Sequence, residues 1–201
     1  MSFEGLLTRL EGRLVVLEPL TPEHEAGLAR AADDAEAWRW MPRVITGPDA
    51  FHGWMTDALA EAAAGVSAPY AILSRASGEP VGSSRYLTLR PEHRGLEIGY
   101  TWHKSSVWGT GVNVEAKLLL LEHAFERFGC MRVEFKTDAR NERSRGALLA
   151  LPATFEGIFR KHMIVRDGEL RDSAYYAITD DDWPAVKAGL TRRLEAKLQV
   201  S

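Results

Sequence analysis

The chain has 201 residues, of which 45% are hydrophobic and 26% charged, enough for one well-buried core and not obviously enough for two. We therefore expect one α/β domain over residues 1–201. The net charge of −3 gives no bulk attraction to nucleic acid. No apolar run reaches membrane-spanning length and the N-terminus lacks a secretory pattern, so we expect a cytoplasmic protein without membrane partners.

The single cysteine, Cys130, excludes an intrachain disulfide, and we interpret it as a buried apolar thiol. The first half of the chain predicts a strand over residues 13–20, a helix that begins at Thr21-Pro22, and an alanine-rich helix over residues 48–65. Residues 70–74 and 80–89 read as paired strands around the turn Ser77-Gly78-Glu79.

The most informative segment, residues 96–116, predicts a strand, a glycine-bearing turn and a helix. The turn is Trp108-Gly109-Thr110-Gly111, and such a turn before a helix directs backbone N–H groups and the positive end of the helix dipole toward an anion. Val112 and Asn113 stand where a P-loop needs Lys and Ser or Thr, and Val114 replaces the third glycine of a dinucleotide motif. A backbone cradle for pyrophosphate remains, with a tight connection as the alternative.

The rest of the chain continues the alternation of helices and strands. A helix over residues 112–128 stops at Gly129, and a strand follows over residues 131–137. Asn141 is a good N-cap, with Ser144 three residues later. The last elements are a hairpin of residues 158–165 and 170–178 about Asp167-Gly168, and a helix over residues 180–197.

In this order, the motifs resemble the GNAT superfamily of acetyl-CoA-dependent N-acetyltransferases, and in particular its ribosomal-protein N-terminal acetyltransferases. The resemblance extends from about Arg13 to Trp183. It rests on the following matches: Glu97-Ile98-Gly99-Tyr100, Trp108-Gly109-Thr110-Gly111, Glu115-Ala116, Asn141-Glu142-Arg143-Ser144, Phe155-Glu156-Gly157, Arg160-Lys161-His162 and residues 172–178. It implies a GNAT fold, with a mixed, mostly antiparallel sheet flanked by helices.

The chain departs from this family at three points. Ser106 stands where the cradle usually opens with Gln or Arg, so one contact to the pyrophosphate is expected to be missing. Residues 148–152 replace a polar Glu and a Leu-Gly pair with leucines and Pro152, which predicts an unusual end to that helix. The tyrosine that many members use as a proton donor is absent.

The reaction implied by the resemblance requires a base, because an α-amino group with a pKa of about 7.7–8.0 is mostly protonated at neutral pH. Glu97 is our candidate, on a strand where simple alternation places it on one face with Gly99 and Thr101. A solvated carboxylate or a salt-bridge partner is the alternative. Ser144 is the candidate donor to the sulfur, although it also fits a capping role, and a backbone N–H near Thr101 or Trp102 can stabilise the oxyanion.

Together, the turn and the resemblance predict a set of acetyl-CoA-binding residues and no metal site. The predicted set is Thr101, Trp102, His103, Trp108, Gly109, Thr110, Gly111, Val112, Asn113, Asn141 and Ser144. Asn141 has two compatible roles, as a helix cap and as a partner of the pantetheine arm. Tyr175, Tyr176 and His162 are reserve candidates for proton transfer, with His162 interpreted first as a surface residue.

Each of several other prominent side chains has a structural interpretation and a ligand-binding interpretation. Trp108 fits a core anchor better than a platform under the CoA arm. Arg140, Arg143 and Arg145 fit a solvated helix face or contacts to the CoA phosphate. The N-terminal aromatic cluster is interpreted first as core or dimer contacts and second as a substrate wall: Trp38, Trp40, Met41, Phe51 and Trp54.

The sequence thus predicts an N-acetyltransferase that uses acetyl-CoA and a primary amine, either a protein N-terminus or a small molecule, with a homodimer plausible from the family. The alternative is an acyl-CoA sensor or interaction module that kept the cradle and lost turnover. Residues 148–152 and the missing tyrosine motivate that alternative. The acceptor depends on loops whose shape the sequence does not give.

Overall fold

The computed structural model describes residues 2–166 and 168–199. Within them, eight strands form one sheet in the order β1-β2-β3-β4-β5-β6-β8-β7. The strands are β1 (Leu10–Glu11), β2 (Val15–Pro19), β3 (Ala68–Ser74), β4 (Pro80–Arg90), β5 (Gly95–His103), β6 (Arg132–Asp138), β7 (Thr154–Val165) and β8 (Glu169–Thr179). The α-helices are α1 (Glu25–Ala32), α2 (Ala35–Trp38), α3 (Pro48–Ala63), α4 (Val112–Glu122), α5 (Glu142–Leu149) and α6 (Trp183–Leu198).

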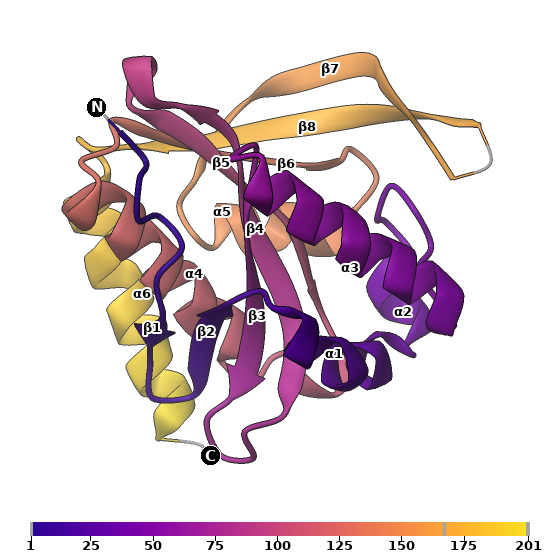
Figure 1. Ribbon diagram of the computed structural model, residues 1–201. Coiled ribbons are helices and arrows are strands. Elements are labelled where there is room, and N and C mark those ends of the chain that lie inside the picture. Colours follow the sequence, from indigo (N-terminus) through magenta and orange to yellow (C-terminus); the bar gives the residue numbers. More distant parts are fainter. Residues whose placement is uncertain (1, 167, 200–201) are drawn as a thin grey trace.

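Helices cover both faces of the sheet, as Figure 1 shows. On one face α4 and α6 lie side by side, and their leucines, among them Leu120, Leu121 and Leu190, pack on the strands. On the other face α1, α2 and α3 enclose a second apolar cluster around Trp38, Phe51 and Trp102. The predicted mixed α/β fold with a mostly antiparallel sheet is confirmed.

Strands β5 and β6 form the one parallel pair among the described strands, and this pairing is short. It joins Gly95 to Arg132, Leu96 to Val133 and Glu97 to Glu134. Both strands continue beyond these pairs, β5 to His103 and β6 to Asp138, without further ladder partners to each other. The sheet is therefore split between the carboxyl ends of its two middle strands.

A β-bulge interrupts β5 beside this split. Gly99 pairs with Arg85 and Trp102 pairs with Ser83, so the intervening Tyr100 and Thr101 together face Ser84 alone. Tyr100 takes a positive φ of 47°. The simple alternation predicted for this strand is therefore wrong after Gly99. Trp102 belongs to the cluster under α1–α3, and Thr101 instead contacts α4.

The turn between β1 and β2 is fastened to α4 by one buried carboxylate. Glu115 accepts hydrogen bonds from the amides of Arg13, Leu14 and Val15 at 2.7, 2.6 and 2.8 Å. A β-carbon on Gly12 would lie 2.4 Å from the same carboxylate, so glycine permits this close approach. The motif residue Glu115 thereby positions the start of the sheet.

The predicted boundaries agree with most of the observed elements. The long predicted helix is α4 followed by a π-helical turn over His123–Arg127, and it ends at Gly129, which has a φ of 58°. Strands β7 and β8 form the predicted hairpin, although Asp167, placed at its turn, lies outside the described residues. Cys130 is buried, and burial raises the pKa of its thiol to about 11.

The β7–β8 hairpin extends past the sheet toward the loop that follows α2 (Figure 1). There the Arg166 amide donates to the Pro42 carbonyl at 3.0 Å, and the Arg166 guanidinium donates to the Met41 carbonyl at 2.7 Å. The loop and the hairpin are thus joined. No helix among the described residues is long and apolar enough to span a membrane.

Candidate active site

A cavity of about 370 Å³ lies at the split between β5 and β6. Its walls come from both strands and Leu87 of β4, from the N-terminal part of α4, from α5 and α6, from the loop after α2 and from the β7–β8 hairpin. Most of the predicted site residues line it: Glu97, Thr101, Trp102, His103, Trp108, Gly109, Asn113, Asn141 and Ser144. The other three predicted residues do not line the cavity. The Thr110 hydroxyl donates a hydrogen bond to the Val107 carbonyl, and Gly111 and Val112 are buried.

Glu97 is 3% exposed and reaches the cavity from β5. Its Oε2 atom accepts hydrogen bonds from Lys136 Nζ at 3.1 Å and from Thr88 Oγ1 at 3.3 Å. Within the described part of the chain, Oε1 receives no hydrogen bond. Glu97 is therefore a buried salt-bridge partner, as the alternative interpretation held, and it still has one carboxylate oxygen available to a ligand.

Lys117 of α4 also lines the cavity, and sequence reasoning missed it. Its Nζ donates to Thr101 Oγ1 at 2.9 Å and lies 5.4 Å from the ring centre of Phe135. Burial lowers the pKa of Lys117 to about 7, against an opposing effect of Glu97. A signal was present, because Lys117 falls three residues after Val114 and four before Leu121, on the apolar stripe of the helix.

The glycine turn has the conformation of an anion cradle. Gly109 and Gly111 have φ values of 79° and 104°, in the left-handed region that favours glycine, and Gly111 is the N-cap of α4. Among the described residues, no acceptor is found for the amides of Gly109, Gly111, Asn113 and Val114. These N–H groups and the N-terminus of α4 offer unpaired donors to an anionic group.

Trp108 and Arg143 stand beside this cradle. The Trp108 indole donates to the His103 carbonyl at 3.1 Å, and the Arg143 guanidinium lies 3.4 Å from the ring centre. Trp108 is 37% exposed, so its interpretation as a core anchor is wrong. Arg143 is the one member of its predicted trio that lines the cavity, since Arg140 pairs with Asp138 and Glu169 and Arg145 with Tyr176.

His103, at the end of β5, is 7% exposed and lines the cavity. Burial, with the charges of Lys117 and Arg143, lowers the pKa of His103 to about 3, so the ring is neutral at physiological pH. Its Nε2 atom is buried and has no hydrogen-bond partner among the described residues. A buried ring nitrogen without a partner favours a ligand that completes its hydrogen bonding.

Asn141 caps α5 as predicted, because its Oδ1 accepts from the Ser144 amide at 3.0 Å. The Asn141 amide NH2 group keeps its donors, so the capping role does not exclude a ligand contact. The Ser144 hydroxyl makes no hydrogen bond to the described residues. At the unusual end of this helix, Leu148 of α5 and Leu151 just after it are buried in the cavity wall.

The aromatic cluster of α2 and α3 divides between core and cavity. Trp38, Phe51 and Trp54 are buried around Trp102, which confirms the core interpretation for them. Trp40 and Met41 instead line the cavity, as the second interpretation held.

His162 is partly exposed and does not line the cavity, in agreement with its interpretation as a surface residue. Its Nδ1 lies 3.0 Å from Ser173 Oγ, and its Nε2 lies 3.3 Å from the Tyr175 hydroxyl. The imidazole is therefore held on the face of the sheet by two hydroxyl groups. Tyr176 does not face the cavity, because its hydroxyl accepts from Arg145 in the core on the other face.

The comparisons with known proteins agree with this architecture. The model of the acetyltransferase (GNAT) domain matches residues 14–152. A structure from T. thermophilus, described as an acetyltransferase, is 40% identical, with 92% of this chain and 96% of that chain covered and a TM-score of 0.83. The comparison with curated proteins found no match.

Two further structures represent the branch named by the resemblance. Mycobacterium smegmatis RimJ, in complex with CoA-disulfide, is 26% identical over 94% of this chain and 96% of its own, with a TM-score of 0.80. RimL, a ribosomal L7/L12 alpha-N-protein acetyltransferase, is 18% identical and shares the fold over 86% and 94% of the two chains, with a TM-score of 0.76. Because the family model matches more than half of this chain, the chain belongs to the GNAT acetyltransferase family.

Proposed function

We propose that the chain, acting as one catalytic domain, transfers the acetyl group of acetyl-CoA to a primary amine, either a protein N-terminus or a small molecule. One observation carries the proposal. The cavity that holds the unbonded Oε1 of Glu97 is continuous with the region where Gly109 and Asn113 present unpaired donors. A base and an anion site are therefore available to one ligand.

The acetyl-CoA arm is proposed to enter at the glycine turn. The amides of Gly109, Asn113 and Val114 would receive the pyrophosphate, and Arg143 of α5 would supply the cation that Ser106 does not. The Asn141 amide and the unpartnered His103 Nε2 would bond the pantetheine arm. The similar RimJ is described in complex with CoA-disulfide, which supports a CoA compound as the ligand of this fold.

The chemistry then follows from the positions of the remaining groups. Glu97 Oε1 takes a proton from the amine, whose nitrogen attacks the thioester carbonyl carbon. The main chain of Thr101 or Trp102, beside the bulge, donates to the developing oxyanion. The carbon–sulfur bond breaks, the Ser144 hydroxyl donates a proton to the thiolate, and it regains a proton from the nitrogen of the new amide. A thiol with a pKa near 8.5 leaves readily, so this last contribution is expected to be small.

The test is calorimetric titration with CoA, followed by measurement of amine-dependent CoA release across a library of short peptides and small amines. We expect CoA binding at the cavity and release with at least one amine. Lack of CoA binding contradicts the proposal.

A second candidate is an acyl-CoA-binding module without turnover. It is favoured by the absence of a tyrosine on α5, where Ser144 is the hydroxyl that faces the cavity. The same release assay separates the two functions. CoA release that depends on any amine rejects the module, and CoA binding without release across the library supports it.

A further inference from the structure

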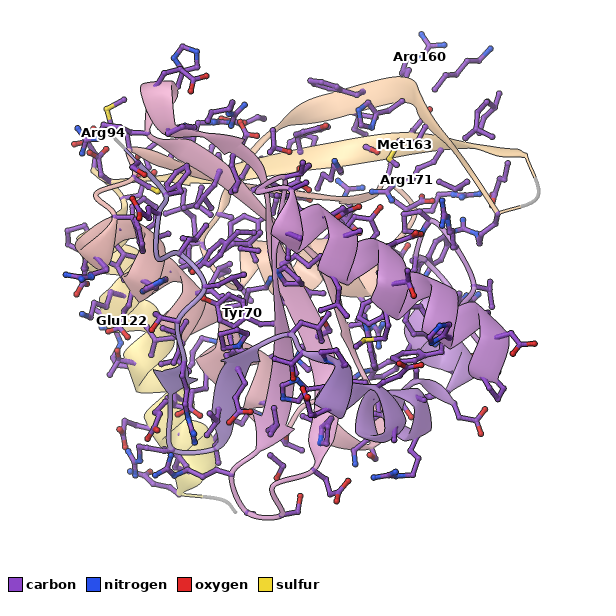
Figure 2. All side chains as sticks on the ribbon, in the orientation of Figure 1. Tyr70, Arg94, Glu122, Arg160, Met163 and Arg171 are labelled. Atoms are coloured by element: carbon purple, nitrogen blue, oxygen red, sulfur yellow. The ribbon has the colours of Figure 1, made fainter. Side chains whose placement is uncertain are left out.

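Arg171 is a buried cation that the proposed chemistry does not use. It lies on β8 opposite Met163 of β7, lines the cavity and is 5% exposed. Figure 2 shows both residues on the hairpin, and shows Arg160 of the same hairpin at its outer edge. Along β8, Arg171 shares a face with Tyr175, which pairs with Lys136, so it lies on the side of the sheet from which Glu97 is reached.

The guanidinium of Arg171 has no hydrogen-bond partner among the described residues, and its Nε atom is fully buried. Asp138 is the carboxylate with the largest electrostatic effect on Arg171. However, both Asp138 oxygens already accept from Arg140, at 3.0 and 2.8 Å. A buried guanidinium without acceptors is costly, and the cost is recovered when an anion binds.

The residues that line the cavity carry more positive than negative charge, which also favours an anionic ligand. Glu97 is the one carboxylate among its described lining residues, and it is paired with Lys136. Arg143 stands at the cradle, where the phosphates of CoA would lie. Toward the hairpin, Arg171 is thus a cation that donates to no carboxylate among the described residues, and the proposed CoA position supplies no anion there.

We propose that the acceptor amine carries a carboxylate, and that Arg171 binds this carboxylate while Glu97 receives the proton of the amine. This inference rests on the proposed function and names the substrate class for it. A planar carboxylate accepts two parallel hydrogen bonds from one guanidinium. A phosphate dianion would need a second cation, and the nearby Lys136 is already paired with Glu97. The carboxylate can belong to a free amino acid or to an acidic residue near a peptide N-terminus.

Matched acceptor pairs test this specificity in the intact protein. The peptide amides Ser-Asp-Ala and Ser-Glu-Ala are compared with Ser-Asn-Ala and Ser-Gln-Ala, and free amino acids are compared with their amides. We expect kcat/KM to be at least ten times higher for the acid in one of these two series, and that series identifies the source of the carboxylate. Equal values for acid and amide in both series overturn the inference.

Substitutions then assign the preference to Arg171. Arg171→Gln is expected to lower kcat/KM for the acid by about 10- to 100-fold and to change that for the amide less than about threefold. Arg171→Lys should recover part of the preference. Arg160→Gln, on the exposed side of the same hairpin, is the matched control and should keep it. A parallel loss for acid and amide, or a loss of CoA affinity, overturns the assignment.

A binding experiment separates failure of this inference from failure of the proposed function. The CoA-loaded protein is titrated with N-acetylated Ser-Asp-Ala amide and N-acetylated Ser-Asn-Ala amide, and with the N-acetylated form of a free amino acid and of its amide. If no amine supports CoA release, the proposed function fails. Tighter binding of an acid that is lost in Arg171→Gln then still supports the carboxylate site, and equal binding within both pairs rejects it.

Discussion

The Nζ atom of Lys117 lies 2.9 Å from the Oγ1 atom of Thr101, and this contact joins the middle of α4 to the bulged strand. Thr101 Oγ1 also lies 2.7 Å from Ser84 Oγ. The lysine is thus held against the sheet at a position that apolar residues normally occupy. The Thr101 hydroxyl, itself bonded to Ser84, solvates it in place of water.

The buried Lys117 should make stability depend on pH. Its folded pKa of about 7 is below the ordinary value of 10.5, so between these values the unfolded chain holds a proton that the folded chain lacks. The free energy of unfolding should therefore rise as pH increases from about 7 to 10.5, and the destabilisation should be complete below pH 7. Lys117→Met should flatten this dependence and stabilise the protein at pH 6 by on the order of 3 kcal/mol.

Urea unfolding at a series of pH values measures this effect, with Lys104→Met as a control at a partly exposed lysine. The Met variant leaves no orphaned hydroxyl, because Thr101 keeps Ser84 as a partner. An unchanged slope in the Lys117 variant would refute the assignment.

Glu97→Gln should lower the rate of acetyl transfer by about 100-fold, because an amide cannot accept the proton of the amine. The loss should be greatest at low pH, where more of the amine is protonated, and CoA affinity should stay near that of the wild type. The measurement is the pH profile of kcat/KM together with calorimetric CoA titration. An unchanged profile would remove Glu97 as the base.

Glu134→Gln is the matched control for Glu97. Glu134 pairs with Glu97 across the parallel ladder, but its carboxylate binds Arg90 and Arg132 and does not line the cavity. This variant should alter stability and leave the shape of the pH profile unchanged.

The roles of Asn141 and Ser144 can be distinguished by how their substitutions affect the stability of the protein. Asn141→Ala removes the cap of α5, so unfolding should become easier by about 1 kcal/mol and CoA binding should weaken. Ser144→Ala keeps the cap, since the capping bond uses the Ser144 backbone N–H, and should lower kcat slightly with no loss of stability. Thermal unfolding and steady-state kinetics provide the two measurements. Equal destabilisation by both substitutions would contradict this division of roles.

Glu115→Ala should destabilise the protein by about 2–4 kcal/mol, because three backbone amides lose their common acceptor. Glu122→Ala, on the same helix and partly exposed in an ion pair with Lys187, should cost less than about 1 kcal/mol. Denaturant unfolding of both variants tests the difference. Similar values for the two would show that Glu115 does not fasten the first turn.

The sequence predicted the strand-turn-helix of the cradle and the cap at Asn141, because glycine spacing and an N-cap are local signals. It did not predict the bulge, since nothing in the residue type of Tyr100 requires its positive φ. That single residue reverses the face of Thr101 and made the alternation from Glu97 fail. Arg171 was missed for another reason: alternation assigns a face to a residue, but the lack of a partner depends on how Arg140 occupies Asp138.

The short parallel pairing of β5 and β6 has a mechanical consequence. Among the described residues, three ladder pairs join strands β1 to β5 to the remaining strands β6, β8 and β7. A ligand bound between the diverging strands would contact both parts of the sheet at once. Its binding free energy would then add to the free energy of unfolding, so the protein is expected to be most stable with the ligand bound.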